Sequence, residues 1–208
     1  PETSFNYEFG ARYDGRVFVE GIGFYSDFSN KGESCSNAYP CSNGATSGTF
    51  ITGEAVVAGV EVQVGHVFET GQITWPLSVS YTHSMAEARD DAADSGVLDG
   101  DTLASVPQNS LSLRLGAQVG SRWDSYAVVK YVDEMCVEIG CNREASNFAQ
   151  TESFFVVDVG TRYAVTDALS AFVKVENAFD ERAIVSRQPD GARPNKPLTA
   201  MLGVEWIF

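Results

Sequence analysis

The 208-residue sequence lacks any apolar run of the roughly 18–20 residues that a membrane-spanning helix needs, which excludes a helical membrane protein. It is poor in positive charge, with 14 lysines and arginines against 28 aspartates and glutamates, a formal net charge of −14. Because binding to nucleic-acid phosphates requires clustered lysine and arginine, this balance argues against a nucleic-acid partner. Only 20% of the residues are charged and 44% are hydrophobic, a composition that excludes a disordered chain.

Histidine is nearly absent, since His66 and His83 are the two in the chain. Neither lies near a Gly-x-Ser-x-Gly elbow, and the sequence has no His-Glu-x-x-His, phosphate-loop or dinucleotide-binding motif. We expect His66 in a turn and His83 near the outer end of a strand, both as surface residues. The sequence therefore predicts no enzyme, no catalytic residue, no cofactor and no metal site.

What the chain does contain is a period-two alternation of apolar and polar residues, which is typical of β-strands with one apolar face. The clearest example runs from Phe5 to Tyr13, and another ends the chain from Leu198 to Phe208. The alternation predicts an all-β fold of nine antiparallel strands, over residues 5–13, 17–28, 56–64, 77–81, 111–119, 127–131, 155–165, 169–175 and 198–208.

The links between these strands alternate strictly in length. The short ones are 14–15, 66–74, 120–124 and 166–168, and the long ones are 29–52, 87–109, 136–152 and 178–197. Up-and-down transmembrane β-barrels have this pattern, with tight periplasmic turns and long outer loops. A soluble β-sandwich would mix its link lengths and use Greek-key crossings.

Two sets of side chains support a barrel wall. Aromatic residues near the strand ends fit two interfacial girdles: Tyr13, Trp75, Tyr81, Trp123, Tyr126, Tyr163 and Trp206. Charged residues on the opposite strand faces would line the lumen: Glu8, Arg12, Arg114, Asp158, Arg162, Lys174, Glu176 and Glu205.

An odd number of strands cannot close a single-chain bacterial barrel, and open strand edges are costly in lipid. The chain also begins at Pro1 without an initiator methionine, a basic segment or an apolar leader. We therefore expect a mature or excised segment, about nine strands of a larger barrel.

Four cysteines occur as two close pairs, Cys35 with Cys41 and Cys136 with Cys141, in polar stretches. Local disulfides in an oxidising compartment are the simplest interpretation, although the sequence alone leaves the pairing open. A four-cysteine metal site is the alternative, but these spacings are poor for zinc.

Several segments together resemble the C-terminal half of TonB-dependent outer-membrane receptors, closest to the ferric-dicitrate and siderophore receptor group. These segments are Gly59–Glu61, Tyr81–Thr82, Asp101–Leu113, Tyr131–Met135, Asn177–Asp180, Ser186–Pro194 and the terminal Phe208. The similarity extends from Pro1 to Phe208, and the order and spacing of the segments are more specific than any one of them.

The resemblance implies a barrel of about 22 strands in the bacterial outer membrane, of which residues 1–208 would be the C-terminal part. In this family an N-terminal plug domain fills the barrel and carries the segment that the energy-transducing TonB complex grips. The plug is absent from this sequence. The implied function is import of a ferric chelate, with outer-membrane lipid, lipopolysaccharide and the barrel-assembly machinery as further partners.

A locally basic segment, Glu181–Lys196, stands out in this acidic chain because it contains Arg182, Arg187, Arg193 and Lys196. Arginine grips carboxylates in a bidentate fashion, so these residues are the candidate ligand-binding site for an anionic chelate. The alternative is a loop that contacts lipopolysaccharide phosphates or packs on its neighbours. The acidic loop from Arg89 to Asp101 has no calcium-binding spacing, and we expect it to be solvated.

The last strand directs Leu202, Val204, Trp206 and Phe208 to one side and stops at an aromatic carboxy-terminal residue. In outer-membrane barrels such an end resembles the signal that the assembly machinery reads by β-augmentation. Two alternatives to the receptor stay open on sequence grounds: a passive porin-like channel, and a soluble acidic β-sandwich that acts as a binding module.

Overall fold

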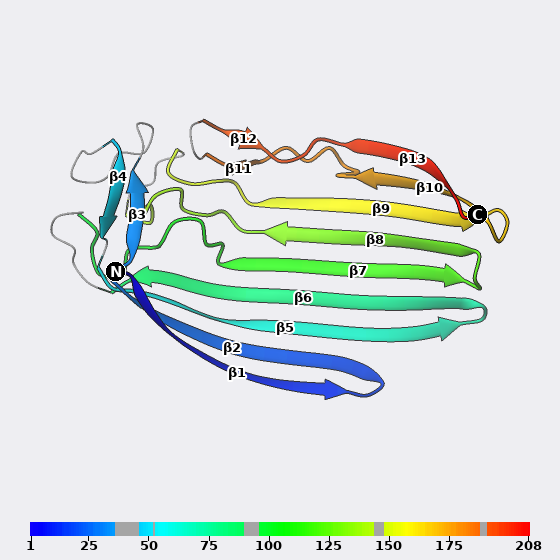
Figure 1. The fold of residues 1–208 in the computed structure, drawn as a ribbon, viewed down its shortest axis with the longest axis horizontal. Coiled ribbons are helices and arrows are strands. Elements are labelled where there is room, and N and C mark those ends of the chain that lie inside the picture. The colour runs from blue at the N-terminus through cyan, green and yellow to red at the C-terminus, as the bar shows by residue number, and fades with distance from the viewer. Residues whose placement is uncertain (36–45, 52, 90–95, 144–147, 188–190) are drawn as a thin grey trace.

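The computed structural model in Figure 1 describes residues 1–35, 46–51, 53–89, 96–143, 148–187 and 191–208, without the side chains of residues 33–35, 50 and 51. This described part contains thirteen strands. Within it, no helix is long and apolar enough to cross a membrane.

Nine of the strands form one antiparallel sheet in which each strand lies beside its neighbour in the sequence (Figure 1). Their bounds are β1 Thr3–Asp14, β2 Val17–Ser29, β5 Ala55–Thr70, β6 Ile73–Ala88, β7 Asn109–Val119, β8 Trp123–Val132, β9 Phe154–Ala164, β10 Leu169–Glu176 and β13 Thr199–Trp206. The nine predicted strands are confirmed, although β5 and β6 are longer than predicted.

The sheet has one apolar and one polar face, as the alternation predicted. The register of strand pairing places residues of the same face side by side in all nine strands. For example, Tyr7 pairs with Tyr25, and Val62 pairs with Tyr81. The resulting apolar face exposes large side chains such as Phe9 at 82% and Leu202 at 86%. Exposed apolar surface of this extent is typical of a wall bathed in lipid.

The short and long links lie at opposite ends of the sheet (Figure 1). We call these ends the turn end and the outer end. The C-terminus lies at the turn end and the N-terminus at the outer end, as the strand count predicted.

One turn is misplaced in the prediction, because His66 lies inside β5 rather than in a link. The strand continues to Thr70, and the reversal to Ile73 needs only Gly71 and Gln72. Gly71 has a φ of +63°, the left-handed conformation that tight hairpin turns require. The side chain of His66 is anchored by a contact of 2.7 Å between its Nδ1 and the carbonyl oxygen of Arg16.

Two long links contain small hairpins that the sequence analysis did not predict. Strands β3 (Gly32–Cys35) and β4 (Gly48–Ile51) pair in the first, and β11 (Ile184–Ser186) and β12 (Arg193–Pro194) pair in the last. Both hairpins extend from the outer end of the main sheet (Figure 1).

The buried core sits at the outer end, where loops cover the sheet. Ala55 of β5 and Ala86 of β6 form a cluster with Leu103 of the β6–β7 link, and Phe28 and Ile139 pack against it. Ala55, Ala86 and Phe28 belong to the polar face by register. The outer loops therefore fold over the polar face rather than over the apolar one.

Glycines on the polar face make room for aromatic rings. A Cβ at Gly160 would lie 2.6 Å from the ring of Tyr126, which pairs with it across β8 and β9. A Cβ at Gly203 would lie 2.5 Å from the ring of Phe172 in the neighbouring strand. These rings therefore lie flat along the wall.

Candidate functional site

The predicted basic segment begins with an arginine that is already paired. The Arg182 guanidinium donates to Oδ2 of Asp180 at 2.8 Å, and the backbone N–H of Leu198 donates to Oδ1 at 3.2 Å. These donors, with the arginine the larger cause, hold the pKa of Asp180 below its ordinary value. Asp180 has a φ of +51°, so the chain reverses here and brings residues 182 and 198 to the same carboxylate.

Lys196 belongs to a second group of ion-paired side chains, at the outer end of β10. It donates to Glu176, whose other oxygen accepts from Lys174 at 2.6 Å. Two cations therefore share one carboxylate. Asn177 is 3% exposed and fastens the base of the loop, because its amide donates to the carbonyl oxygens of Glu181 and Lys196, each at 2.9 Å.

The remaining two arginines lie on the β11–β12 hairpin or beside it. Arg187 donates to the carbonyl oxygen of Gln150 at 2.7 Å and stands 5.6 Å from the centre of the Phe148 ring. Arg193 pairs with Ser186 of β11 through its backbone, and its side chain forms no hydrogen bond or ion pair within the described residues. Three of the four predicted cations thus have different anchors, and the contact of all four with a ligand stays a prediction.

The acidic β6–β7 loop differs from its prediction at Asp101, which is buried and not solvated. Its side chain is 2% exposed, and Oδ1 accepts from Nε of Arg143 at 2.7 Å. Its other oxygen accepts the backbone N–H of Leu98 at 2.8 Å. Burial follows because Arg143, from the next loop, neutralises the carboxylate. Asp90, Asp91 and Asp94 lie outside the described residues.

Backbone contacts join three outer loops into one unit, which we call the loop cluster (residues 96–108, 133–143, 148–153 and 183–187). Ser105 donates to the carbonyl oxygen of Cys136 at 2.8 Å, and Gly140 donates to that of Thr102 at 3.0 Å. Glu152 donates from its backbone to the carbonyl oxygen of Ile184 at 2.8 Å. The loops between β6 and β13 therefore support one another.

One of the two disulfides is confirmed. Cys136 and Cys141 are bonded, with their Cα atoms 5.6 Å apart, and both are buried in the loop cluster. Cys41 and the side chain of Cys35 lie outside the described residues, so their pairing stays a prediction. Within the described part of the chain, no group of metal-ligating side chains could hold an ion.

The polar face below the loop cluster carries ion pairs between neighbouring strands. Lys130 of β8 donates to Asp158 of β9 at 3.1 Å. Arg162 of β9 donates to Ser170 at 2.9 Å and to Glu205 of β13 at 2.5 Å. The Arg114 guanidinium carbon stands 4.4 Å from the centre of the Tyr126 ring, a cation–π contact.

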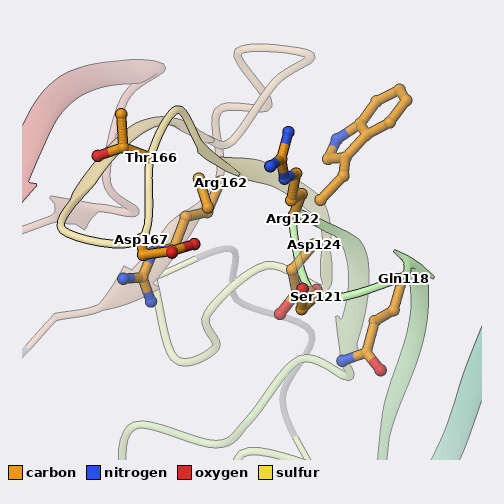
Figure 2. A pocket seen from close by; sticks show the side chains of 10 residues that line it. Gln118, Ser121, Arg122, Asp124, Arg162, Thr166 and Asp167 are labelled. Atoms are coloured by element: carbon orange, nitrogen blue, oxygen red, sulfur yellow. The ribbon is translucent and has the colours of Figure 1, made fainter.

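A cavity of about 490 Å³ opens at the turn end, between the β7–β8 and β9–β10 turns (Figure 2). Two arginines and two aspartates line it together with smaller polar groups: Arg122, Arg162, Asp124, Asp167, Gln118, Ser121 and Thr166. The polar face is thus charged from the loop cluster down to this cavity.

The C-terminal strand places its predicted assembly residues on the apolar face. Leu202, Val204 and Trp206 are each more than 70% exposed there, and Phe208 follows two residues after the strand. Recognition of this strand by the barrel-assembly machinery stays a prediction.

Sequence reasoning missed two residues that shape the site. Asn177 belongs to one of the segments that carry the family resemblance, but its role depends on a left-handed φ of +49°. Arg143 gave no local signal, because its partner Asp101 lies in another loop.

Comparison with known proteins gives consistent matches. The model of the TonB dependent receptor-like β-barrel family matches residues 1–178. The chain is 25% identical over 216 residues to the ferric-pyoverdine 358 receptor of Pseudomonas putida, covering 100% of the chain and 24% of the relative. It is 26% identical over 200 residues to the ferripyoverdine receptor of Pseudomonas aeruginosa, covering 87% and 22%.

Among solved structures, the ferric yersiniabactin uptake receptor FyuA from Yersinia pestis aligns with a TM-score of 0.77 at 20% identity. That alignment covers 100% of this chain and 30% of FyuA. The chain spans about a quarter of the length of the curated relatives it matches.

Proposed function

Because the chain belongs to the TonB-dependent receptor β-barrel family, we propose that it is part of the wall of a receptor that imports a ferric chelate. Proteins of this family lie in the outer membrane of Gram-negative bacteria, and so does this chain. The two curated relatives are receptors for ferric pyoverdines, and FyuA takes up ferric yersiniabactin. These names support a ferric chelate as cargo.

The observation that carries the proposal is the two-faced sheet. A mainly apolar face continues in register over nine antiparallel strands, and the opposite face carries ion pairs. Such a wall suits lipid on one side and a water-filled or protein-filled lumen on the other. The loop cluster covers the polar side, where an incoming ligand would have to pass.

The ligand contacts in this proposal come from the basic segment. Arg187 and Arg193 stand at the β11–β12 hairpin, which extends outward (Figure 1). Arg182 and Lys196 lie at the base of the same loop, where Asp180 and Glu176 hold them. Anionic oxygens of a chelate can replace these carboxylates at the same guanidinium and ammonium groups.

The partners in this proposal are those of a complete receptor. A plug domain would fill the barrel of about 22 strands, and TonB would act on that plug. Residues 1–208 would then be the C-terminal portion of the barrel. Outer-membrane lipid and lipopolysaccharide would contact the apolar face, and the assembly machinery would bind β13.

The fold decides against the soluble β-sandwich. A sandwich needs two packed sheets with Greek-key links, whereas here every main strand follows its sequence neighbour in one sheet. A passive channel has the same fold as a receptor, so only function separates the two.

Uptake of ⁵⁵Fe distinguishes a TonB-dependent receptor from a passive channel. A strain that lacks the complete gene would be compared with a complemented strain, using ferric pyoverdine, ferric citrate and a ferric catecholate as probes. We expect one probe to accumulate only in the complemented strain and only when TonB is functional. Equal uptake with and without TonB would support the passive channel, and equal uptake with and without the gene would refute an import role.

A further inference from the structure

The β11–β12 hairpin is too short to keep its own position. In the described part of the chain, two residue pairs join its strands: Ile184 with Pro194, and Ser186 with Arg193. An isolated two-stranded hairpin is at best marginally stable in water, so contacts with other segments must orient this one. Those contacts therefore decide where its two arginines, Arg187 and Arg193, are presented.

The returning part of the β8–β9 loop holds the hairpin along β11. Glu152 binds Ile184 twice: its backbone N–H donates to the Ile184 carbonyl oxygen at 2.8 Å, and its carboxylate accepts the Ile184 N–H at 2.7 Å. Two residues earlier, the carbonyl oxygen of Gln150 accepts from Nε of Arg187 at 2.7 Å. The position of β11 is therefore set by residues 150–152 of another loop.

The same residues are braced by the disulfide between Cys136 and Cys141. Gln150 forms a β-bridge with Cys136, and its side-chain amide donates to Sγ of Cys141 at 3.3 Å. Backbone hydrogen bonds of 2.8 and 2.9 Å join residues 135–137 to residues 149–151 on either side of this bridge. Gln150 thus contacts both cysteines of the disulfide and, through its carbonyl oxygen, the hairpin.

The disulfide closes residues 136–141 into a ring that is fixed on its other side as well. Ile139 of the ring packs against the buried cluster at the outer ends of β5 and β6. Backbone hydrogen bonds at Cys136 and Gly140 join the ring to residues 102–105. The ring is therefore a fixed point between the β6–β7 loop and the residues that hold the hairpin.

Burial protects this arrangement from reduction. Cys136 and Cys141 are 6% and 4% exposed, so a reductant reaches their bond only when the loops open. A dithiol then breaks the S–S bond in two exchange steps, which leave two cysteine thiols and convert the dithiol into its own disulfide. Without the bond, residues 136–141 are no longer closed into a ring, and the segment with Gln150 and Glu152 loses its brace.

We propose that the disulfide-closed ring and Glu152 form a latch that holds the β11–β12 hairpin in position, and that reduction of the disulfide releases the hairpin. Glu152 is a positioning residue, because it acts on a ligand only through the hairpin. The link to ligand binding rests on the proposed function, since the hairpin presents Arg187 and Arg193.

The test uses the complete receptor, purified in detergent. Hydrogen exchange, read by mass spectrometry, follows the Ile184 N–H, and binding is measured with the ⁵⁵Fe chelate that shows the highest TonB-dependent uptake. The variant C136S/C141S removes the disulfide, and E152A removes the carboxylate. E152Q keeps an oxygen that can accept the Ile184 N–H, and E138Q changes an exposed carboxylate within the ring as the matched control.

A second way of breaking the bond avoids any substitution in the ring. In the variant C35S/C41S the bond between Cys136 and Cys141 is the one that dithiothreitol can reduce. The reduced and oxidised forms of this receptor are compared in the same two measurements. This comparison decides the proposal if C136S/C141S fails to assemble.

We expect exchange of the Ile184 N–H to accelerate about tenfold in C136S/C141S, in the reduced receptor and in E152A, the effect of losing one or two hydrogen bonds. The affinity for the chelate should fall by a similar factor in these three samples. E152Q and E138Q should match the wild type in both measurements.

Three outcomes would overturn parts of this proposal. Faster exchange confined to residues 135–143, with Ile184 still protected, would show that the disulfide does not hold the hairpin. Normal protection of Ile184 in E152A would remove Glu152 from the latch. Unchanged chelate affinity in a receptor whose Ile184 exchanges faster would refute the link to ligand binding. Failure of the wild type to bind or import any chelate would instead refute the proposed function, while exchange at Ile184 would still decide the latch.

Discussion

At the scale of single residues, the buried ion pair of Asp101 and Arg143 is expected to stabilise the loop cluster beside its backbone hydrogen bonds. Replacing Arg143 by Gln leaves a buried carboxylate with one backbone donor, and we expect a loss of about 1–3 kcal/mol in loop stability. Limited proteolysis of intact cells should show faster cleavage in the β6–β7 and β8–β9 loops.

The matched control for this change is Arg193→Gln, which removes an exposed arginine without a partner in the described part of the chain. Its cleavage rate should equal that of the wild type. If Arg143→Gln cells resist protease equally well, the pair does not stabilise the loops.

The carboxylate of Asp180 predicts a pH dependence. Its pKa is lowered in the folded protein by Arg182 and by the Leu198 N–H, so its stabilising effect is fully present above the unfolded pKa of about 3.9. The effect is lost as the pH falls through the lower, folded value. Hydrogen exchange should show that the Leu198 amide loses protection on acidification below pH of about 4.

Asp180→Asn supplies the comparison for this titration. An amide cannot ionise, so protection of Leu198 in the variant should be weaker at neutral pH and should not change further with acid. A wild-type amide that stays equally protected at every pH would contradict the assignment.

At the scale of one strand, the two faces of β6 predict opposite responses to the same substitution. Val79 lies on the apolar face beside Val64 and Leu113, and Ser80 lies on the polar face beside Gln63 and Ser112. Arginine at a lipid-facing position near the membrane centre costs about 2–4 kcal/mol, so Val79→Arg should lower the urea midpoint of the receptor in detergent or lipid. Ser80→Arg should leave it nearly unchanged, and equal effects of both would contradict the face assignment.

The end of β13 predicts an effect on assembly rather than on stability. Phe208→Ser should lower the amount of folded receptor in the outer membrane several-fold, because β-augmentation of the last strand would lose its aromatic anchor. Ile207→Ser, one residue earlier, is the control and should assemble normally. Quantitative immunoblots of heat-modifiable receptor measure both.

The strands could be predicted from the sequence because two different environments impose a period of two on the side chains. The alternation did not predict β3, β4, β11 and β12. These strands have two to four residues, which is too short for an apolar–polar alternation to be recognised. The alternation also predicted too early an end for β5. The residue types of His66 and Val67 break the apolar–polar alternation, although the backbone continues through both as a strand.

The candidate site could be predicted only in part. Local composition identified Arg182, Arg187, Arg193 and Lys196, but their partners depend on the tertiary fold. The carbonyl oxygen of Gln150, which accepts a hydrogen bond from Arg187, belongs to a residue 37 positions away in the sequence. The burial of Asp101 depends likewise on a residue from another loop, so no neighbouring sequence could reveal it.

At the scale of the whole molecule, β1 and β13 stand at the two ends of the sheet order, and the apolar face is uncovered. The isolated chain should therefore aggregate in plain buffer and stay dispersed only in detergent. In detergent it should also lack the heat-modifiable mobility of a closed barrel. A monodisperse chain in buffer, seen by light scattering, would contradict a lipid-facing wall.

The flat rings on Gly160 and Gly203 have a consequence for the calibre of the passage. A ring that lies against the backbone occupies little of the bore, whereas a methyl group at either glycine would tip it inward and create a constriction. In the proposed receptor these two glycines would thus help to set the clearance available to bulky cargo, and we expect Gly160→Ala to reduce the uptake of large chelates more than that of small ones.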